Sequence, residues 1–141
     1  MMDAASFVSQ LRPAPPGPVE TVEKLYGLGH WLLGQERNAD AALAFRTMLR
    51  SAPSDERSWL ALAVCHERVG QFRIALELYG AGMAIVPSSV RCQIARARLL
   101  RRLSRDLEAE EAFEKASEVA RGLADDELIR LVDTERDNQC H

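Results

Sequence analysis

The adjacent pair Cys65 and His66 is the first place in this sequence to look for chemistry. A thiol next to an imidazole base can act as a nucleophile if the two share a hydrogen bond. Neighbouring residues of a helix point about 100° apart, so this pair is not expected to form that bond. His30, His66 and His141 show no spacing typical of metal ligands.

Cysteines and glycines give no other chemical motif. The three cysteines, at positions 65, 92 and 140, are widely spaced and contain no CxxC, which predicts reduced thiols and neither a disulfide framework nor a zinc site. Gly27 and Gly29, followed by Gly34, do not match the dinucleotide fingerprint. We therefore expect no catalytic residues, no cofactor and no metal, and a protein that is not an enzyme.

Composition indicates one globular domain. The chain has 141 residues, of which 47% are hydrophobic and 28% charged. Its net charge of −3 argues against nucleic acid as a partner. The longest apolar run, from Trp59 to Cys65, is too short to span a membrane, and residues 1–18 lack the pattern of a secretory signal. We expect a cytoplasmic protein.

A step of 34 residues recurs along the chain. It separates Pro53 from Pro87 and Leu28 from Leu62. It also separates three alanines and three aromatic residues: Ala41, Ala75 and Ala109, and Phe45, Tyr79 and Phe113. A fixed period of this length indicates stacked helical hairpins.

The predicted fold is all-α, with three stacked hairpins and a C-terminal capping helix. The expected helices cover residues 19–35 and 39–50, 55–69 and 72–85, 89–103 and 106–121, and finally 125–136. Gly70 and Gly122 are expected to end helices in a left-handed conformation. Residues 1–18, with four of the six prolines, are predicted to form an N-terminal arm before a repeat domain over 19–141, with repeats at about 22–55, 56–89 and 90–123.

The recurring residues have a predicted packing role. An alanine lets the second helix of a hairpin approach the first, and the aromatic residue one turn later fills the space between hairpins. The residues assigned to repeat packing are Leu28, Gly29, Ala41, Phe45, Trp59, Leu62, Ala75, Tyr79, Ala109 and Phe113.

These residues resemble the tetratricopeptide repeat, most clearly over residues 56–89. More narrowly, the stretches LYGLGHWLL at 25–33 and WLALAVC at 59–65 resemble the first two repeats of type III secretion chaperones. That resemblance implies a cytoplasmic chaperone for a secreted translocator or needle subunit. It also implies a homodimer through the N-terminal arm, where Phe7, Val8 and Leu11 would supply the contact.

The first helix of each hairpin is expected to line a concave groove that binds a partner protein. Residues at 3-4-3 spacing share one face of each of these helices. The expected groove residues are Tyr26, His30, Leu33, Arg57, Leu60, Val64, Glu67, Ile94, Arg98 and Arg101. An apolar strip with charged edges suits an extended peptide or an amphipathic helix. The alternative is that some of these residues pack against the arm.

Arginines at positions 91, 96, 98, 101, 102 and 105 have two interpretations. They form a solvated helix face, or they recognise acidic or carbonyl groups of a partner. Two functions remain open: a secretion chaperone that keeps an export substrate soluble, and a general repeat scaffold for assemblies unrelated to secretion.

Overall fold

The computed structural model describes residues 19–138. Within that range the chain forms helices and no strand, so the predicted all-α fold is confirmed. The helices are α2 (Val19–Gly34), α3 (Asn38–Ser51), α4 (Glu56–Arg68), α5 (Phe72–Ile85), α6 (Val90–Arg102), α7 (Asp106–Gly122) and α8 (Asp126–Asp137). The predicted arm at 1–18, and with it the proposed dimer contact, lies outside the described residues.

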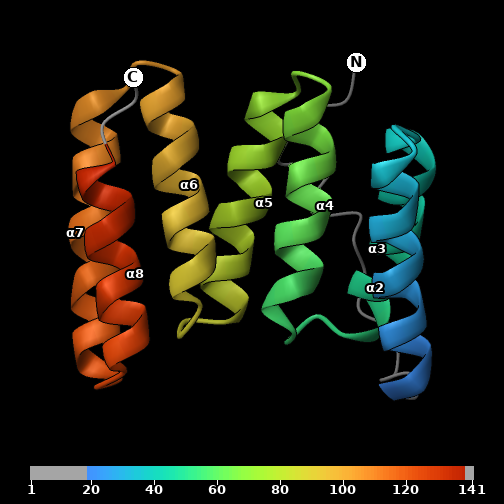
Figure 1. Cartoon of the computed structure of the whole chain (residues 1–141), viewed down its shortest axis with the longest axis horizontal. Coiled ribbons are helices and arrows are strands. Elements are labelled where there is room, and N and C mark those ends of the chain that lie inside the picture. Colours follow the sequence, from blue (N-terminus) through green and yellow to red (C-terminus); the bar gives the residue numbers. More distant parts are fainter. Residues whose placement is uncertain (1–18, 139–141) are drawn as a thin grey trace.

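The helices form three antiparallel hairpins that stand side by side in a row (Figure 1). The hairpins are α2–α3, α4–α5 and α6–α7, and each packs against the next. The last helix, α8, packs on α7 and also contacts α6, while α6 contacts α4. Helix α6 therefore lies between α4 and α8, and the three helices form one wall of the stack.

The turns inside the hairpins repeat the same backbone conformation. Glu36, Gly70 and Ser104, which follow each other at the 34-residue step, all have left-handed φ angles of 59°, 79° and 60°. Gly70 is the stop that the sequence predicts. The prediction that Gly122 ends a helix in the left-handed conformation is wrong. Gly122 lies within α7, and the left-handed residue that follows this helix is Ala124, with φ 53°.

Side-chain caps fix the starts of three helices. Asp55 accepts a hydrogen bond from the Arg57 amide at the start of α4, and Ser89 accepts one from the Cys92 amide at the start of α6. Asp125 accepts two amide hydrogen bonds at the start of α8. These bonds satisfy amides that have no partner within the helix, and they set where each helix of the wall begins.

The aromatic residues of the repeat lie in the core. Phe45 and Phe113 are fully buried, and Tyr79 is 2% exposed. Gly29 is needed where it stands, because a Cβ atom there would lie 2.3 Å from Cε1 of Phe45. The other residues assigned to repeat packing are buried too, except Leu28.

Leu28 corrects the prediction of a packing role, because it is 47% exposed whereas Leu62, one step later, is fully buried. Leu62 belongs to α4, which packs on the preceding hairpin through α3. Within residues 19–138, α2 has no preceding hairpin against which Leu28 can pack.

Candidate partner-binding groove

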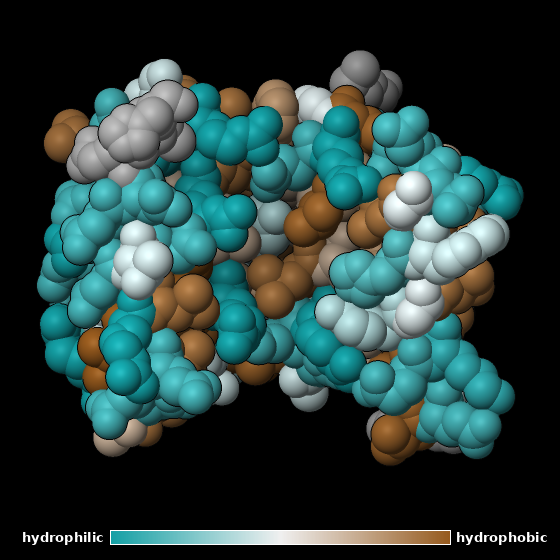
Figure 2. All heavy atoms as spheres, viewed as in Figure 1, coloured by the Kyte–Doolittle hydropathy of each residue, from teal (hydrophilic) through white to brown (hydrophobic). Residues whose placement is uncertain are grey.

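A cavity of about 680 Å³ opens on the wall formed by α4, α6 and α8. Figure 2 shows this face hollowed in the middle, with hydrophobic atoms at the bottom of the hollow and hydrophilic atoms around it. Leu60 and Val64 of α4, Ile94 and Ala95 of α6, and Leu131 of α8 supply apolar surface. Tyr79 of α5 also lines the cavity, and charged side chains from α4, α6 and α8 form the rest of the lining: Glu67, Arg68, Arg91, Arg98, Arg102 and Glu135.

Five of the ten expected groove residues line this cavity. They are Leu60, Val64, Glu67, Ile94 and Arg98. All five lie on the first helix of the second or third hairpin, where the 3-4-3 spacing places them on one face of the helix. Leu60 and Val64 are half-buried and leave surface open in the hollow, whereas Ile94 is only 4% exposed.

Several lining residues were missed by reasoning from the sequence. Leu131 and Glu135 come from α8, for which the sequence predicts only the role of a capping helix. Arg102 stands one residue beyond the predicted face of α6, but its long side chain reaches the cavity. Continuing the 34-residue step from Arg101 into α8 would have identified Glu135.

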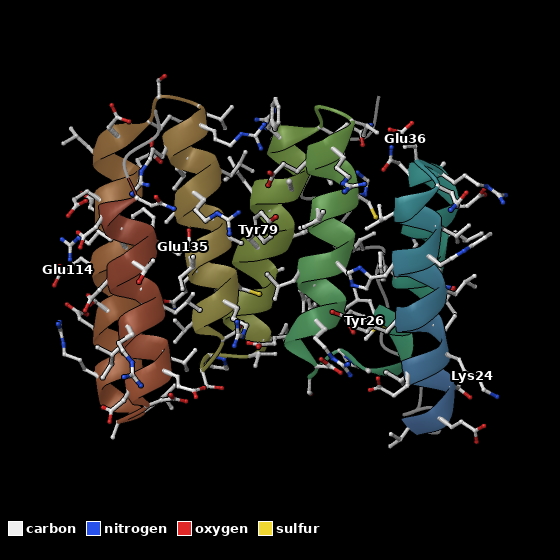
Figure 3. All side chains as sticks on the ribbon, viewed as in Figure 1. Lys24, Tyr26, Glu36, Tyr79, Glu114 and Glu135 are labelled. Carbon is white, nitrogen blue, oxygen red and sulfur yellow. The ribbon has the colours of Figure 1, made fainter. Side chains whose placement is uncertain are left out.

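Glu67 is held at the edge of the cavity by two neighbours. The hydroxyl of Tyr79 donates to its Oε1 at 3.1 Å, and Nη1 of Arg102 donates to its Oε2 at 2.6 Å. Burial, reinforced by the Glu67 carboxylate, raises the pKa of Tyr79 above its ordinary value, so the phenol stays protonated and remains a donor. Figure 3 labels Tyr79 on α5 and Glu135 on α8, one on each side of α6.

Two other arginines of the cavity have looser partners. The Arg98 side chain is 59% exposed, and its Nε lies 3.6 Å from Oε2 of Glu135. The Arg91 side chain is 56% exposed, and its Nε lies 3.5 Å from Oε1 of Glu56. At these distances and exposures an ion pair contributes little, so both guanidinium groups are available to a partner at small cost.

Leu33 and Arg101 correct the predicted lining. Leu33 is 6% exposed, belongs to the hydrophobic core and is not among the residues that line the cavity. Arg101 turns away to α8, where its guanidinium donates to the carbonyl oxygens of Glu135, Arg136 and Asn138 at 3.2, 3.0 and 2.8 Å. It also lies 4.5 Å from the centre of the Phe113 ring, so it joins α8 to the last hairpin.

Tyr26, His30 and Arg57 form a separate group around α2. The Tyr26 and His30 rings meet edge to face with centres 4.4 Å apart, and both lie next to Phe45. The Arg57 guanidinium covers the Tyr26 ring at 4.6 Å. The expected apolar strip therefore does not reach α2 as part of this cavity.

Burial disfavours a catalytic role for Cys65 and His66. Burial raises the pKa of Cys65 to about 11, and it lowers the pKa of His66, whose Nδ1 is 2.6 Å from Oε1 of Gln71. Burial likewise raises the pKa of Cys92 to about 11. Both thiols are therefore protonated and poor nucleophiles near neutral pH.

A second cavity of about 460 Å³ adjoins the first, since Arg91 and Leu131 line both. It is surrounded by the carboxylates Asp55, Glu56, Asp125 and Glu127 at the starts of α4 and α8. Asp55 and Asp125 cap their helices, and Glu56 accepts a 2.7 Å hydrogen bond from the Ser89 hydroxyl. The wall is therefore acidic at this end.

The described residues contain neither a metal site nor a membrane-spanning helix. No group of three or more His, Cys, Asp or Glu side chains within 19–138 is placed to hold a metal ion. None of the helices from α2 to α8 is long and apolar enough to cross a membrane.

Comparison with known proteins gives a clear fold and a group of similar structures. The type III secretion translocator chaperone SycD of Yersinia enterocolitica is 25% identical, with a TM-score of 0.72, and the match covers 83% of this chain and 88% of SycD. PcrH, in complex with the chaperone binding region of PopD, is also 25% identical, with a TM-score of 0.67 over 85% of this chain and 91% of PcrH.

The TPR2B domain of yeast Sti1 has the same architecture, with a TM-score of 0.71 and 19% identity over 82% of this chain and 93% of that domain. No protein-family model and no curated protein sequence matches the chain significantly. The chain therefore adopts a tetratricopeptide-repeat-like fold, the fold of solved type III secretion translocator chaperones.

Proposed function

We propose that this protein is a cytoplasmic type III secretion chaperone. In this proposal the cavity between α4, α6 and α8 binds a segment of an export substrate, a translocator or needle subunit, and keeps it soluble until secretion. The observation that carries the proposal is the open apolar floor made by Leu60, Val64 and Leu131. An apolar surface of this kind, framed by charged side chains, is typical of a site for another chain.

Similar structures support the choice of partner. The protein with the PopD segment bound and the Yersinia chaperone share both the fold and about a quarter of the aligned residues with this chain. The covering of apolar segments needs no acid, base, metal or cofactor. We therefore propose binding, not catalysis, as the activity of the protein.

The test is co-expression of the full chain with a translocator or needle subunit from the same host. Leu60→Glu and Val64→Arg place a charge on the apolar floor and should leave the substrate insoluble, while wild type keeps it in the soluble fraction. The matched control is Leu107→Glu, because Leu107 is 84% exposed at the start of α7 and takes no part in the cavity. Circular dichroism confirms that each variant is folded.

Two results would contradict the proposal. If folded Leu60→Glu and Val64→Arg variants keep the substrate as soluble as wild type does, the cavity is not the binding site. If wild type neither binds nor solubilises any secretion substrate of its host, the secretion function itself is wrong.

The second candidate is a general repeat scaffold unrelated to secretion. It is favoured by the TPR2B domain of Sti1, which matches this chain as well in shape as the secretion chaperones do. Affinity purification from the native host distinguishes the two, because a scaffold would co-purify with folded cytoplasmic proteins and with no secretion substrate.

A further inference from the structure

The charge of the cavity between α4, α6 and α8 differs in sign from that of the whole protein. Four arginines and two glutamates line it, a local excess of two positive charges, whereas the chain carries a net charge of −3. A partner segment that carries negative charge is therefore attracted to this cavity, although the net charge of the protein repels it.

The two glutamates do not cancel the positive charge in equal measure. Both oxygens of Glu67 are occupied, by Tyr79 and by Arg102. Glu135 reaches Arg98 only at 3.6 Å, with the arginine side chain 59% exposed. The guanidinium of Arg98 thus stands beside the apolar floor with open donors, and guanidinium donors match a carboxylate in geometry as well as in charge.

The opposite end of the wall sets a limit on where an acidic residue can bind. The second cavity is surrounded by Asp55, Glu56, Asp125 and Glu127, with Arg91 between the two cavities. A carboxylate placed there would meet like charge. Favourable sites for negative charge are therefore confined to the end of the cavity that holds Arg98 and Arg102.

We propose that the cavity recognises a segment with an apolar anchor and with acidic residues on one side of it, the anchor seated on Leu60, Val64 and Leu131 and the carboxylates directed at Arg98 and Arg102. This inference rests on the proposed function and specifies the chemistry of its substrate. Residues 1–18 of the chain do not fit the description, because they contain one acidic residue, Asp3, and one arginine, Arg12.

The experiment measures fluorescence anisotropy of the full chain with three synthetic, fluorescein-labelled 13-residue peptides. All three have the same leucine-rich centre, followed on one side by two aspartates, two asparagines or two lysines. At low salt, each aspartate should tighten binding about fivefold relative to the asparagine that replaces it in the second peptide. This advantage should shrink as salt is added. The lysine peptide should bind most weakly.

A charge reversal separates recognition from a structural effect. Arg98→Glu leaves three arginines and three glutamates in the lining, so it should abolish the order and the three peptides should bind about equally. The control is Arg50→Glu, an exposed position on α3 that changes the net charge equally and lies outside the cavity. It should keep the wild-type order.

The outcomes separate this inference from the proposed function. If the aspartate and asparagine peptides bind equally and Leu60→Glu abolishes both, the charge preference is wrong and the apolar groove stands. If Arg98→Glu and Arg50→Glu act alike, the effect is one of net charge and the inference is overturned. If no peptide binds, or if Leu60→Glu changes nothing, the groove fails together with the preference.

Discussion

Arg57 of α4 holds Glu23 of α2 through two hydrogen bonds, of 2.6 Å from Nη2 to Oε1 and of 3.2 Å from Nη1 to Oε2. The two residues are 34 positions apart, so the repeat places them next to each other on successive hairpins. The same guanidinium donates to Asp55, the residue that caps α4, and covers the ring of Tyr26. One side chain thus joins two hairpins and a helix cap.

Arg57→Gln should lower the free energy of unfolding by about 1 kcal/mol at pH 7. Hydrogen bonds from Arg57 lower the pKa of both Asp55 and Glu23 below their ordinary values of 3.8 and 4.5. The stabilisation is therefore present above those values and is lost as the pH falls through the lowered pKa values. Urea unfolding of both proteins, at pH 7 and in acid, measures this difference.

The control for this prediction is Arg37→Gln, since Arg37, which precedes α3, and Asp40 of its first turn form an exposed pair. Its effect should be smaller. A loss on Arg57→Gln that stays constant down to strongly acidic pH would mean that packing on Tyr26, and not the carboxylates, is what Arg57 provides.

Arg101→Met should loosen α8, because it removes three hydrogen bonds to the last carbonyl oxygens of that helix. We expect a loss of about 1–2 kcal/mol in stability and faster hydrogen exchange of the α8 amides. Arg130→Met is the matched control, since Arg130 is exposed on α8 itself. If α8 keeps its protection in Arg101→Met, the side chain does not hold the helix.

The helices were predictable because a 34-residue period fixes where each hairpin turns. Their observed bounds differ from the expected ones by no more than one residue at every end, and α5 at Phe72–Ile85 matches at both ends. The same period predicts burial of the aromatic series from Phe45 to Phe113, since each aromatic residue meets an equivalent neighbour. The spacing of residues in the sequence is sufficient to predict burial where every repeat has the same surroundings.

The groove was less predictable because surroundings differ from repeat to repeat. Glu67 and Arg101 hold the same position in successive repeats, yet Glu67 lines the cavity and Arg101 binds the end of α8. Leu33, at the position equivalent to Glu67 in the first repeat, is buried in the core. A repeat offset gives the face of a helix, but the neighbours on that face decide what the side chain does.

Ser104→Gly and Glu36→Gly should raise stability by up to about 1 kcal/mol. Both residues have left-handed φ angles, at which a Cβ atom is strained, and glycine is not. Gly70→Ala, at the equivalent turn, should lower stability by about 1 kcal/mol for the same reason. Guanidinium unfolding of the three variants measures these shifts, and an opposite sign at Ser104 would mean that its side chain stabilises the turn more than its backbone strains it.

Gly27→Ala and Gly29→Ala should have opposite effects although they lie two residues apart in α2. A Cβ at Gly27 meets no atom within 4 Å, so alanine should stabilise the helix by about 0.5–1 kcal/mol. A Cβ at Gly29 would lie 2.3 Å from the buried Phe45 ring, and the clash should cost about 1–3 kcal/mol. Thermal unfolding measures both, and Phe45→Leu should reduce the cost of the Gly29 change. Equal effects at the two glycines would show that helix propensity, and not the contact between α2 and α3, determines the result.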